Sequence, residues 1–152
     1  MIKKILIFLV INFTALGIGG FFTGPGVSSD WYTNLNQAPW TPPGWFFGAA
    51  WTTIMICFSF FMAFLYEKSY FKKEIIVLYI AQWILNIIWN PIFFHFQNVL
   101  LGLIVISSLT VIVFTFLIRY RKLLKAKTLL ILPYAVWLAI ATSLNIYILL
   151  NN

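Results

Sequence analysis

Apolar runs are the most regular feature of the chain: five of them follow one another, separated by short polar segments. They cover approximately residues 5–22, 42–66, 74–94, 99–118 and 128–150. Each is long enough to cross a bilayer core of roughly 30 Å, and backbone groups that face lipid must form hydrogen bonds within their own segment. The pattern therefore predicts an all-α fold. We expect one integral membrane domain, residues 1–152, of five transmembrane helices with a structured loop between the first two.

The basic residues lie before the first run, between the second and third runs, and between the fourth and fifth. The remaining connections (residues 23–41 and 95–98) and the C-terminal end contain no Lys or Arg. Because cytoplasmic segments of membrane proteins are enriched in Lys and Arg, this bias predicts a cytoplasmic N-terminus and a C-terminus outside. Lys3 and Lys4 before an apolar run also fit a signal peptide, but the four further runs favour a retained helix.

The composition agrees with a membrane protein. Of the 152 residues, 62% are hydrophobic and only 9% are charged, whereas a soluble domain carries about 25% charged residues. The net charge of +7 does not indicate a nucleic-acid partner, because membrane topology accounts for the basic blocks. Cys57 is the single cysteine and His95 the single histidine, so an internal disulfide is excluded and no metal site is expected.

The connection between the first two runs contains a stiff aromatic stretch, residues 31–45, with three tryptophans and three prolines. Thr41 is expected to cap the helix that follows, and Pro42 to occupy its first position. One interpretation is an aromatic belt that anchors the helices at the membrane surface. The other is a lid over the bundle, which we favour because an anchor does not need so stiff a backbone and long loops tend to be functional.

Three amides recur in the third run: Gln82, Asn86 and Asn90, at i, i+4 and i+8. This spacing places them on one helical face, with Trp89 one position away. Such amides can join helices or line a cavity, and the tryptophans favour a polar-lined cavity. Pro91 is expected to bend the helix.

The fifth run places Trp137, Ala141 and Asn145 on one face, at intervals of four. A large ring beside a small alanine leaves room for a flat guest. In the first run, the similar spacing of Ala15 and Gly19 favours close helix packing. No acid, Lys or Arg lies deep in a run, which argues against an ion-coupled pump, and no conventional catalytic set is present.

These segments resemble the tryptophan-rich sensory protein family, also called the translocator protein or peripheral-type benzodiazepine receptor family. The resemblance rests on WYTNLNQAPWTPP at 31–43, Trp51, QWILNIIWNPIFF at 82–94 and LPYAVWLAIATSLN at 132–145. These segments follow the family's order and the match covers nearly the whole chain. The chain is interpreted as a bacterial member located in the cell membrane.

The resemblance implies a five-helix bundle, often dimeric, with a ligand pocket open toward the first loop. The family binds porphyrins, sterols and benzodiazepine-type drugs, and some bacterial members promote light-dependent breakdown of protoporphyrin IX. Trp51 and Trp137 match the tryptophans implicated in ligand contact and photochemistry. The other candidate ligand-binding residues are Tyr32, Pro42, Asn86, Trp89, Asn90 and Ala141, to which the amide stripe adds Gln82.

Two features depart from the family. Tyr147 is followed by no Lys or Arg, so the family's sterol pattern is incomplete, and Ala81 has no small partner four residues later, so this run does not support a homodimer. The resulting hypothesis is a membrane receptor for porphyrins and similar flat apolar ligands, with no cofactor and with light-dependent porphyrin degradation as its only enzymatic candidate. The alternatives are a passive transporter of amphiphiles and a ligand-regulated partner of another membrane protein.

Overall fold

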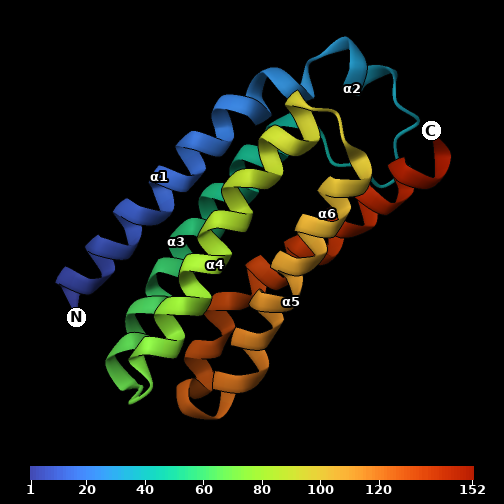
Figure 1. Cartoon of the computed structure of the whole chain (residues 1–152). Coiled ribbons are helices and arrows are strands. Elements are labelled where there is room, and N and C mark those ends of the chain that lie inside the picture. Colours follow the sequence, from blue (N-terminus) through green and yellow to red (C-terminus); the bar gives the residue numbers. More distant parts are fainter.

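The computed structural model describes residues 1–152 as a bundle of long helices without a strand (Figure 1). The long helices are α1 (Ile2–Val27), α3 (Gly44–Lys68), α4 (Lys72–Asn90), α5 (Val99–Leu124) and α6 (Leu132–Asn151). Three short elements connect them: α2 (Asp30–Asn34), the π-helical turn η1 (Pro91–His95) and the 3-10 turn η2 (Lys125–Ile131). The prediction of an all-α chain is confirmed.

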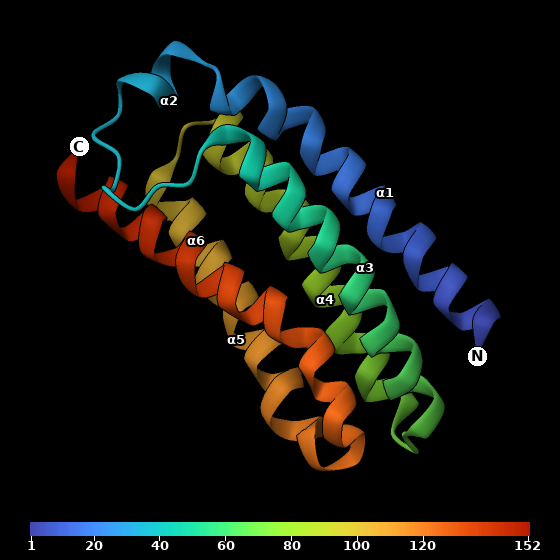
Figure 2. The same cartoon turned by 180° about the vertical axis from the view of Figure 1, so that it is seen from behind.

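Four helical segments are long and apolar enough to cross a membrane: Ile2–Val27, Gly44–Lys68, Lys72–His95 and Val99–Asn151. The fourth segment is 53 residues long and contains the turn η2. At this turn the chain reverses, so that α5 and α6 lie side by side in opposite directions (Figure 2).

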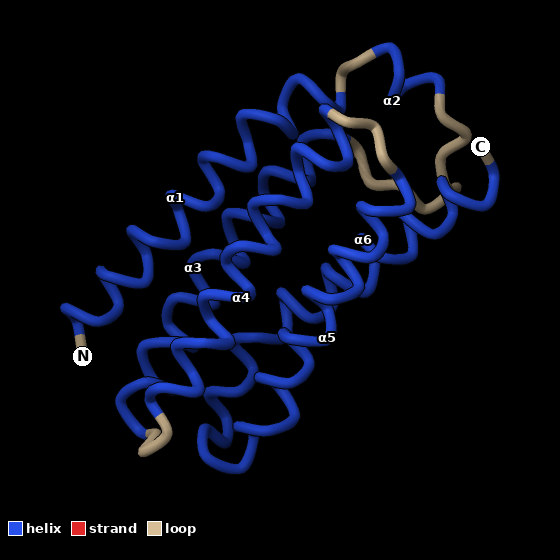
Figure 3. The backbone as a smooth tube through the Cα atoms, in the orientation of Figure 1, coloured by secondary structure: helices blue, strands red, loops and turns tan.

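The two ends of the bundle differ in sequence. The N-terminus, the α3–α4 turn and the α5–α6 turn lie toward one end, whereas α2, the α4–α5 connection and the C-terminus lie at the other (Figure 3). The basic blocks belong to the first end, and the connections at the second contain no Lys or Arg. We call them the basic end and the loop end.

Two predicted helix starts are wrong. α3 begins at Gly44, its N-cap is Pro43, and no side chain caps it, so neither Thr41 nor Pro42 has the expected role. Pro43 disfavours helical backbone in the residue before it, which keeps Pro42 outside the helix. The last helix begins at Leu132 instead of residue 128, because the preceding residues form the tighter turn η2.

The main core lies toward the basic end and is built around aromatic rings. Phe58 is fully buried and its ring centroid lies 5.2 to 6.1 Å from those of Phe61, Tyr79, Phe116 and Tyr134. Such edge-to-face and offset ring contacts add favourable electrostatics to the packing. These residues come from α3, α4, α5 and α6, so one cluster holds four long helices together.

A buried hydrogen-bond network joins α1 to this core. The Asn12 amide donates to Ser59 Oγ over 2.8 Å and accepts from the Tyr79 hydroxyl over 2.7 Å. Buried polar groups without partners are destabilising, and here the side chains satisfy one another across three helices. Apolar contacts alone would leave the rotation of α1 free, so this network also fixes which face α1 turns inward.

Candidate functional site

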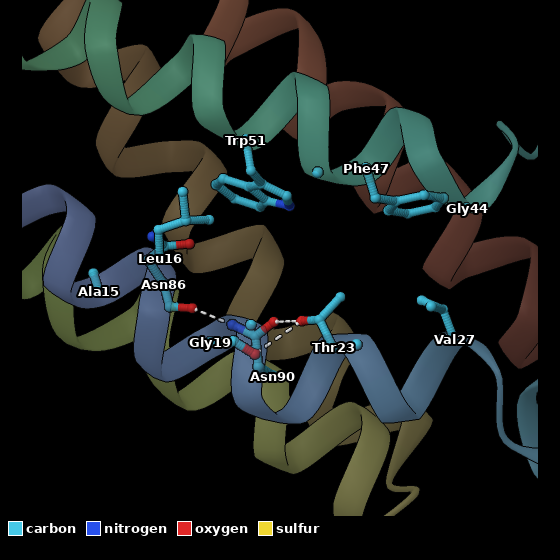
Figure 4. A pocket seen from close by; sticks show the side chains of 13 residues that line it. Ala15, Leu16, Gly19, Thr23, Val27, Gly44, Phe47, Trp51, Asn86 and Asn90 are labelled. Atoms are coloured by element: carbon cyan, nitrogen blue, oxygen red, sulfur yellow. Dashed lines mark hydrogen bonds between the residues drawn. The ribbon is translucent and has the colours of Figure 1, made fainter.

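A cavity of about 260 Å³ lies between α1, α3 and α4 at the loop end. Its α1 wall is made of small residues, among them Ala15, Gly19 and Gly20. Trp51 and Phe47 project from α3 toward it and face Asn90 and Thr23 on the opposite side (Figure 4). The complete lining is Ala15, Leu16, Gly19, Gly20, Thr23, Gly24, Val27, Gly44, Phe47, Gly48, Trp51, Asn86 and Asn90.

Gly19 serves both packing and the cavity. A Cβ atom at this position would lie 2.7 Å from the Asn90 amide nitrogen, a separation that a carbon and a nitrogen do not tolerate without a shift. The predicted close helix packing of α1 through Ala15 and Gly19 therefore agrees with this arrangement, and the same small side chains leave space beside them.

Both polar atoms of the Asn90 side chain form hydrogen bonds within the protein. Pro91 has no N–H, so the carbonyl of Ile87 loses its helical partner. The Asn90 amide nitrogen lies 3.5 Å from that carbonyl and 2.8 Å from the Asn86 carbonyl, and donates to both. Its oxygen accepts a hydrogen bond from the Thr23 hydroxyl of α1. The Asn90 side chain thus bonds mainly to the Asn86 carbonyl of its own helix and, through Thr23, ties α4 to α1.

The amide of Asn86 is free. The residue is only 6% exposed and lines the cavity, yet its side chain has no hydrogen-bond partner in the protein. A buried amide of this kind gains a partner when a ligand or a water molecule occupies the cavity. Of the two asparagines on the cavity wall, Asn86 is therefore the one available for recognition.

The predicted tryptophan pair is in contact. The Trp51 and Trp137 ring centroids lie 6.4 Å apart at 79°. Trp137 is only 4% exposed and packs edge-on against Phe47 at 5.4 Å. Its indole N–H is buried without any partner. Since a buried indole N–H usually finds an acceptor, this donor marks a place where an acceptor is missing.

A second, smaller cavity of about 30 Å³ adjoins the first. Tyr32, Trp89 and Ala141 line it, and Phe47 lines both cavities. Asn145 fixes its far wall: its oxygen accepts from the Trp89 indole over 3.3 Å and its nitrogen donates to the Val99 carbonyl over 3.0 Å. The Phe47 ring therefore stands between two hollows that contain most of the predicted site residues.

The connection from α1 to α3 is docked across the loop end at two places. Tyr32 of α2 packs against Phe94 at 5.6 Å, and Trp31 against Phe93 at 5.5 Å. Both phenylalanines belong to the π-helical turn that follows Pro91, a kind of irregularity often found at functional sites. Burial raises the pKa of the Tyr32 phenol, so it remains a neutral group.

The second docking place is α6. The Trp40 indole donates to Ser143 Oγ over 3.1 Å and its ring packs on Tyr147 at 5.5 Å. The backbone of Asn36 exchanges hydrogen bonds with the side chain of Asn152, at 2.8 and 3.3 Å. The connection is thus held against the bundle by side-chain contacts at both ends of its path.

Three predicted site residues line neither cavity: Trp137, which packs against Trp51 and Phe47, and also Gln82 and Pro42. Gln82 is buried in the core, where its nitrogen donates to the Tyr134 hydroxyl over 2.7 Å and its oxygen has no partner. Pro42 is half-buried in the connection just before α3 and lines neither cavity. The sequence reasoning missed Phe47 and Thr23. Phe47 precedes Trp51 by one helical turn, so the spacing that grouped the other residues would have found it.

The wall of the larger cavity combines apolar and polar groups. The larger cavity is lined by aromatic rings, amides, a hydroxyl and glycine backbone, with no ionisable side chain among them. No group of three or more His, Cys, Asp or Glu residues is arranged to hold a metal ion. Such walls suit a flat apolar molecule with a small number of polar contacts.

The fold and site define a helical membrane protein with a partly open pocket between α1, α3 and α4, at the end of the bundle where the α1–α3 connection docks. The chain belongs to the TspO/MBR family, which matches residues 6–150. It is 33% identical to the tryptophan-rich protein TspO of Archaeoglobus fulgidus, over 100% of this chain and 96% of that protein. It is 32% identical to the protein of the same name in Chlorobaculum tepidum, over 91% and 89%. It is 28% identical to the translocator protein of Ovis aries, over 89% and 85%. The family prediction is confirmed.

Proposed function

We propose that this protein is a membrane receptor for porphyrins such as protoporphyrin IX and for similar flat apolar ligands. In this proposal the chain crosses a bacterial cell membrane five times, with α5 and α6 as separate spans. The N-terminus and basic end face the cytoplasm and the loop end faces outward, as the distribution of Lys and Arg favours.

The observation that carries the proposal is the unpartnered indole N–H of Trp137, a residue that packs against two residues of the cavity wall, Trp51 and Phe47. Together with the free amide of Asn86 it provides two polar groups that have no partner within the protein. A porphyrin offers large flat faces for the indole rings and polar atoms for the two donors. Its carboxylates would extend toward water and backbone N–H groups, because the loop end has no Lys or Arg.

The size of the hollow requires a conformational change on binding. The cavity of about 260 Å³ lies just below the range of about 300–1,000 Å³ that ligand pockets usually span. A macrocycle would therefore need the space on both sides of Phe47. We expect the Phe47 ring to turn aside, which joins the two cavities and uncovers the Trp137 indole. The docked connection would loosen at Trp40 to admit the ligand.

The test is a visible-light titration of the purified protein with protoporphyrin IX, with tryptophan fluorescence followed in the same sample. We expect a saturable shift of the porphyrin absorbance together with quenching of the indoles. Phe47→Ala should bind more tightly, because the partition is removed. Phe46→Ala is the matched control, since Phe46 also touches Trp137 at 5.8 Å but lines neither cavity. Absence of a saturable shift in the parent protein would overturn the proposal.

The photochemical part of the proposal has its own test. Tryptophan can donate an electron to a photo-excited porphyrin, so no acid or base is required. Replacing Trp51 or Trp137 by Phe keeps the ring packing but removes the better electron donor. We expect the rate of porphyrin bleaching under illumination to fall more than the binding affinity. Equal bleaching rates in parent and variants, measured at the same occupancy, would rule out indole-dependent degradation and leave the receptor proposal standing.

A further inference from the structure

A separate hollow lies on the outer side of the bundle, between the basic-end halves of α1 and α4. It is a groove of about 600 Å³. Isoleucines form most of its length, including Ile7 and Ile11 of α1 and Ile80 of α4, with Trp83 beside them. The Trp83 indole is already satisfied, because it donates to the Ile11 carbonyl over 3.0 Å. Along its length the groove therefore presents hydrocarbon and no free donor.

The mouth of the groove at the basic end is cationic. Lys4 and Tyr66 line it, and the ammonium groups of Lys4 and Lys72 lie 5.8 and 4.9 Å from the centre of the Tyr66 ring. Glu67 pairs with Lys4 and is the one carboxylate at this place. The two ammonium groups and the single carboxylate leave one net positive charge at the mouth.

The groove lies between two weakly covered helices. Only 22% of the apolar window of α1 and 28% of that of α4 are buried, against 44% for α3. The exposed side chains on this face, such as Ile7 and Ile80, are half exposed at 48% and 50%. Inside a membrane such a surface must be covered by lipid or by another protein.

The charge at the mouth decides between these occupants. In a two-fold dimer within a membrane, both copies keep their basic ends on the same side. A copy docked on this groove would bring the lysines of one mouth near those of the other, and like charges repel. A phospholipid with an anionic headgroup meets no such repulsion. Its phosphate would lie between two ammonium groups, and its acyl chain would fill the apolar length.

We propose that the α1–α4 groove is a binding site for an anionic phospholipid of the surrounding bilayer. The headgroup is held by Lys4 and Lys72, and one acyl chain lies along Ile80 and Trp83. This site is distinct from the cavity at the loop end and does not depend on what that cavity binds.

The fluorescence of Trp83 can show which molecule occupies the groove, because bromine atoms on a lipid quench a nearby indole. Trp83 lies about 16 Å along the helix axis from Lys72, at 1.5 Å per residue, which is close to the bilayer centre, where the acyl chains end. We would reconstitute the protein in vesicles containing phosphatidylglycerol or phosphatidylcholine, each brominated near the end of the acyl chain. The Trp83 signal is the difference between the parent and Trp83→Phe. We expect stronger quenching of Trp83 by the brominated phosphatidylglycerol than by the phosphatidylcholine at equal mole fraction.

The lysines are tested by paired substitution. Lys4→Gln combined with Lys72→Gln should remove the preference, by about fivefold for each lysine. Lys122→Gln combined with Lys125→Gln, two exposed lysines of the other basic block, should leave it unchanged. Circular dichroism and thermal unfolding would show that both double variants are folded.

Three results would overturn the proposal. Equal quenching by the two lipids means that the groove holds only bulk lipid. A preference that depends equally on both lysine pairs means that the whole basic end attracts anionic lipid without a site. Weak quenching of Trp83 by both lipids, together with a dimer mass in the same preparation, means that a second copy covers the groove.

Discussion

The two halves of the bundle differ in how closely their side chains pack. At the basic end, rings from four helices surround Phe58 and the polar groups of Asn12, Ser59 and Tyr79 satisfy one another. At the loop end, two hollows remain, an indole N–H and an amide lack partners, and α4 changes into a π-helical turn. Hydrogen bonding is incomplete in both halves, because the Gln82 oxygen and the Tyr120 hydroxyl are also buried without a partner. The difference is therefore one of packing around the aromatic core, and looser packing marks the half that we expect to change on binding.

This contrast shows how a small membrane protein can be stable and still adapt. Helix association in lipid depends on packing and hydrogen bonds, since the hydrophobic effect does not distinguish lipid from protein interior. A well-packed basic end can hold the helices together while the loop end opens around Phe47. The following predictions test this division, beginning with the largest effect.

The first prediction compares two phenylalanines of the same helix. Phe58→Ala should lower the free energy of unfolding by about 3 kcal/mol, because it leaves a cavity among four rings. Phe47→Ala should lower it by less than about 1 kcal/mol, because its ring already borders empty space on both sides. Unfolding by SDS in mixed micelles measures both. Equal losses would mean that the loop end is as tightly packed as the basic end.

The second prediction concerns the join between α1 and the π-helical turn. A Cβ atom on Gly26 would overlap the ring of Phe94, so Gly26→Ala should destabilise the protein by about 2 kcal/mol through overpacking. Gly17→Ala is the matched control in α1, where an added Cβ meets nothing within 4 Å. There the better helix propensity of alanine should add about 0.5–1 kcal/mol. Thermal unfolding in detergent would show opposite shifts, and shifts of the same sign would contradict the packing described.

The third prediction separates a structural amide from a binding amide. Asn12→Leu removes the bonds to Ser59 and Tyr79 and should cost about 1 kcal/mol of stability, without a change in porphyrin affinity. Asn86→Leu breaks no protein hydrogen bond, so stability should hold while porphyrin affinity falls about fivefold. The two variants are compared by SDS unfolding and by porphyrin titration. If porphyrin affinity fell in Asn12→Leu and not in Asn86→Leu, the assignment of ligand recognition to the loop end would be contradicted.

The smallest expected effect lies on the surface of the basic end. Arg119 donates to a Glu74 oxygen over 3.0 Å, and both side chains are well exposed to their surroundings, at 53% and 38%. Exposed ion pairs contribute little, so Arg119→Gln should change the free energy of unfolding by less than about 0.5 kcal/mol. A loss above 1 kcal/mol in the same SDS titration would show that the stability of this half depends on its charges and not on its aromatic core.

Helix positions followed from the sequence because the apolar runs have the length that a bilayer demands. The starts of α3 and α6 could not be predicted from hydropathy, because they are set by the local backbone geometry of Pro43 and of the turn η2. The four-residue spacing grouped Asn86 with Asn90, and both line the larger cavity. It also grouped Trp137 with Ala141, but only Ala141 lines a cavity. Spacing could not reveal that the Asn90 amide nitrogen donates to carbonyls of its own helix next to Pro91. Nor could it reveal that the Gln82 amide nitrogen donates to the Tyr134 hydroxyl.

The sequence by itself determined the class of the protein, its family, the helical runs and the segregation of charge to one end, because these depend on composition and order along the chain. Only the tertiary structure decided which polar groups remain free, that Phe47 divides the hollow, and that a lipid-sized groove opens beside Lys4. Those features depend on distances between side chains from different helices. Such distances are set by how the helices pack, and no single segment contains them.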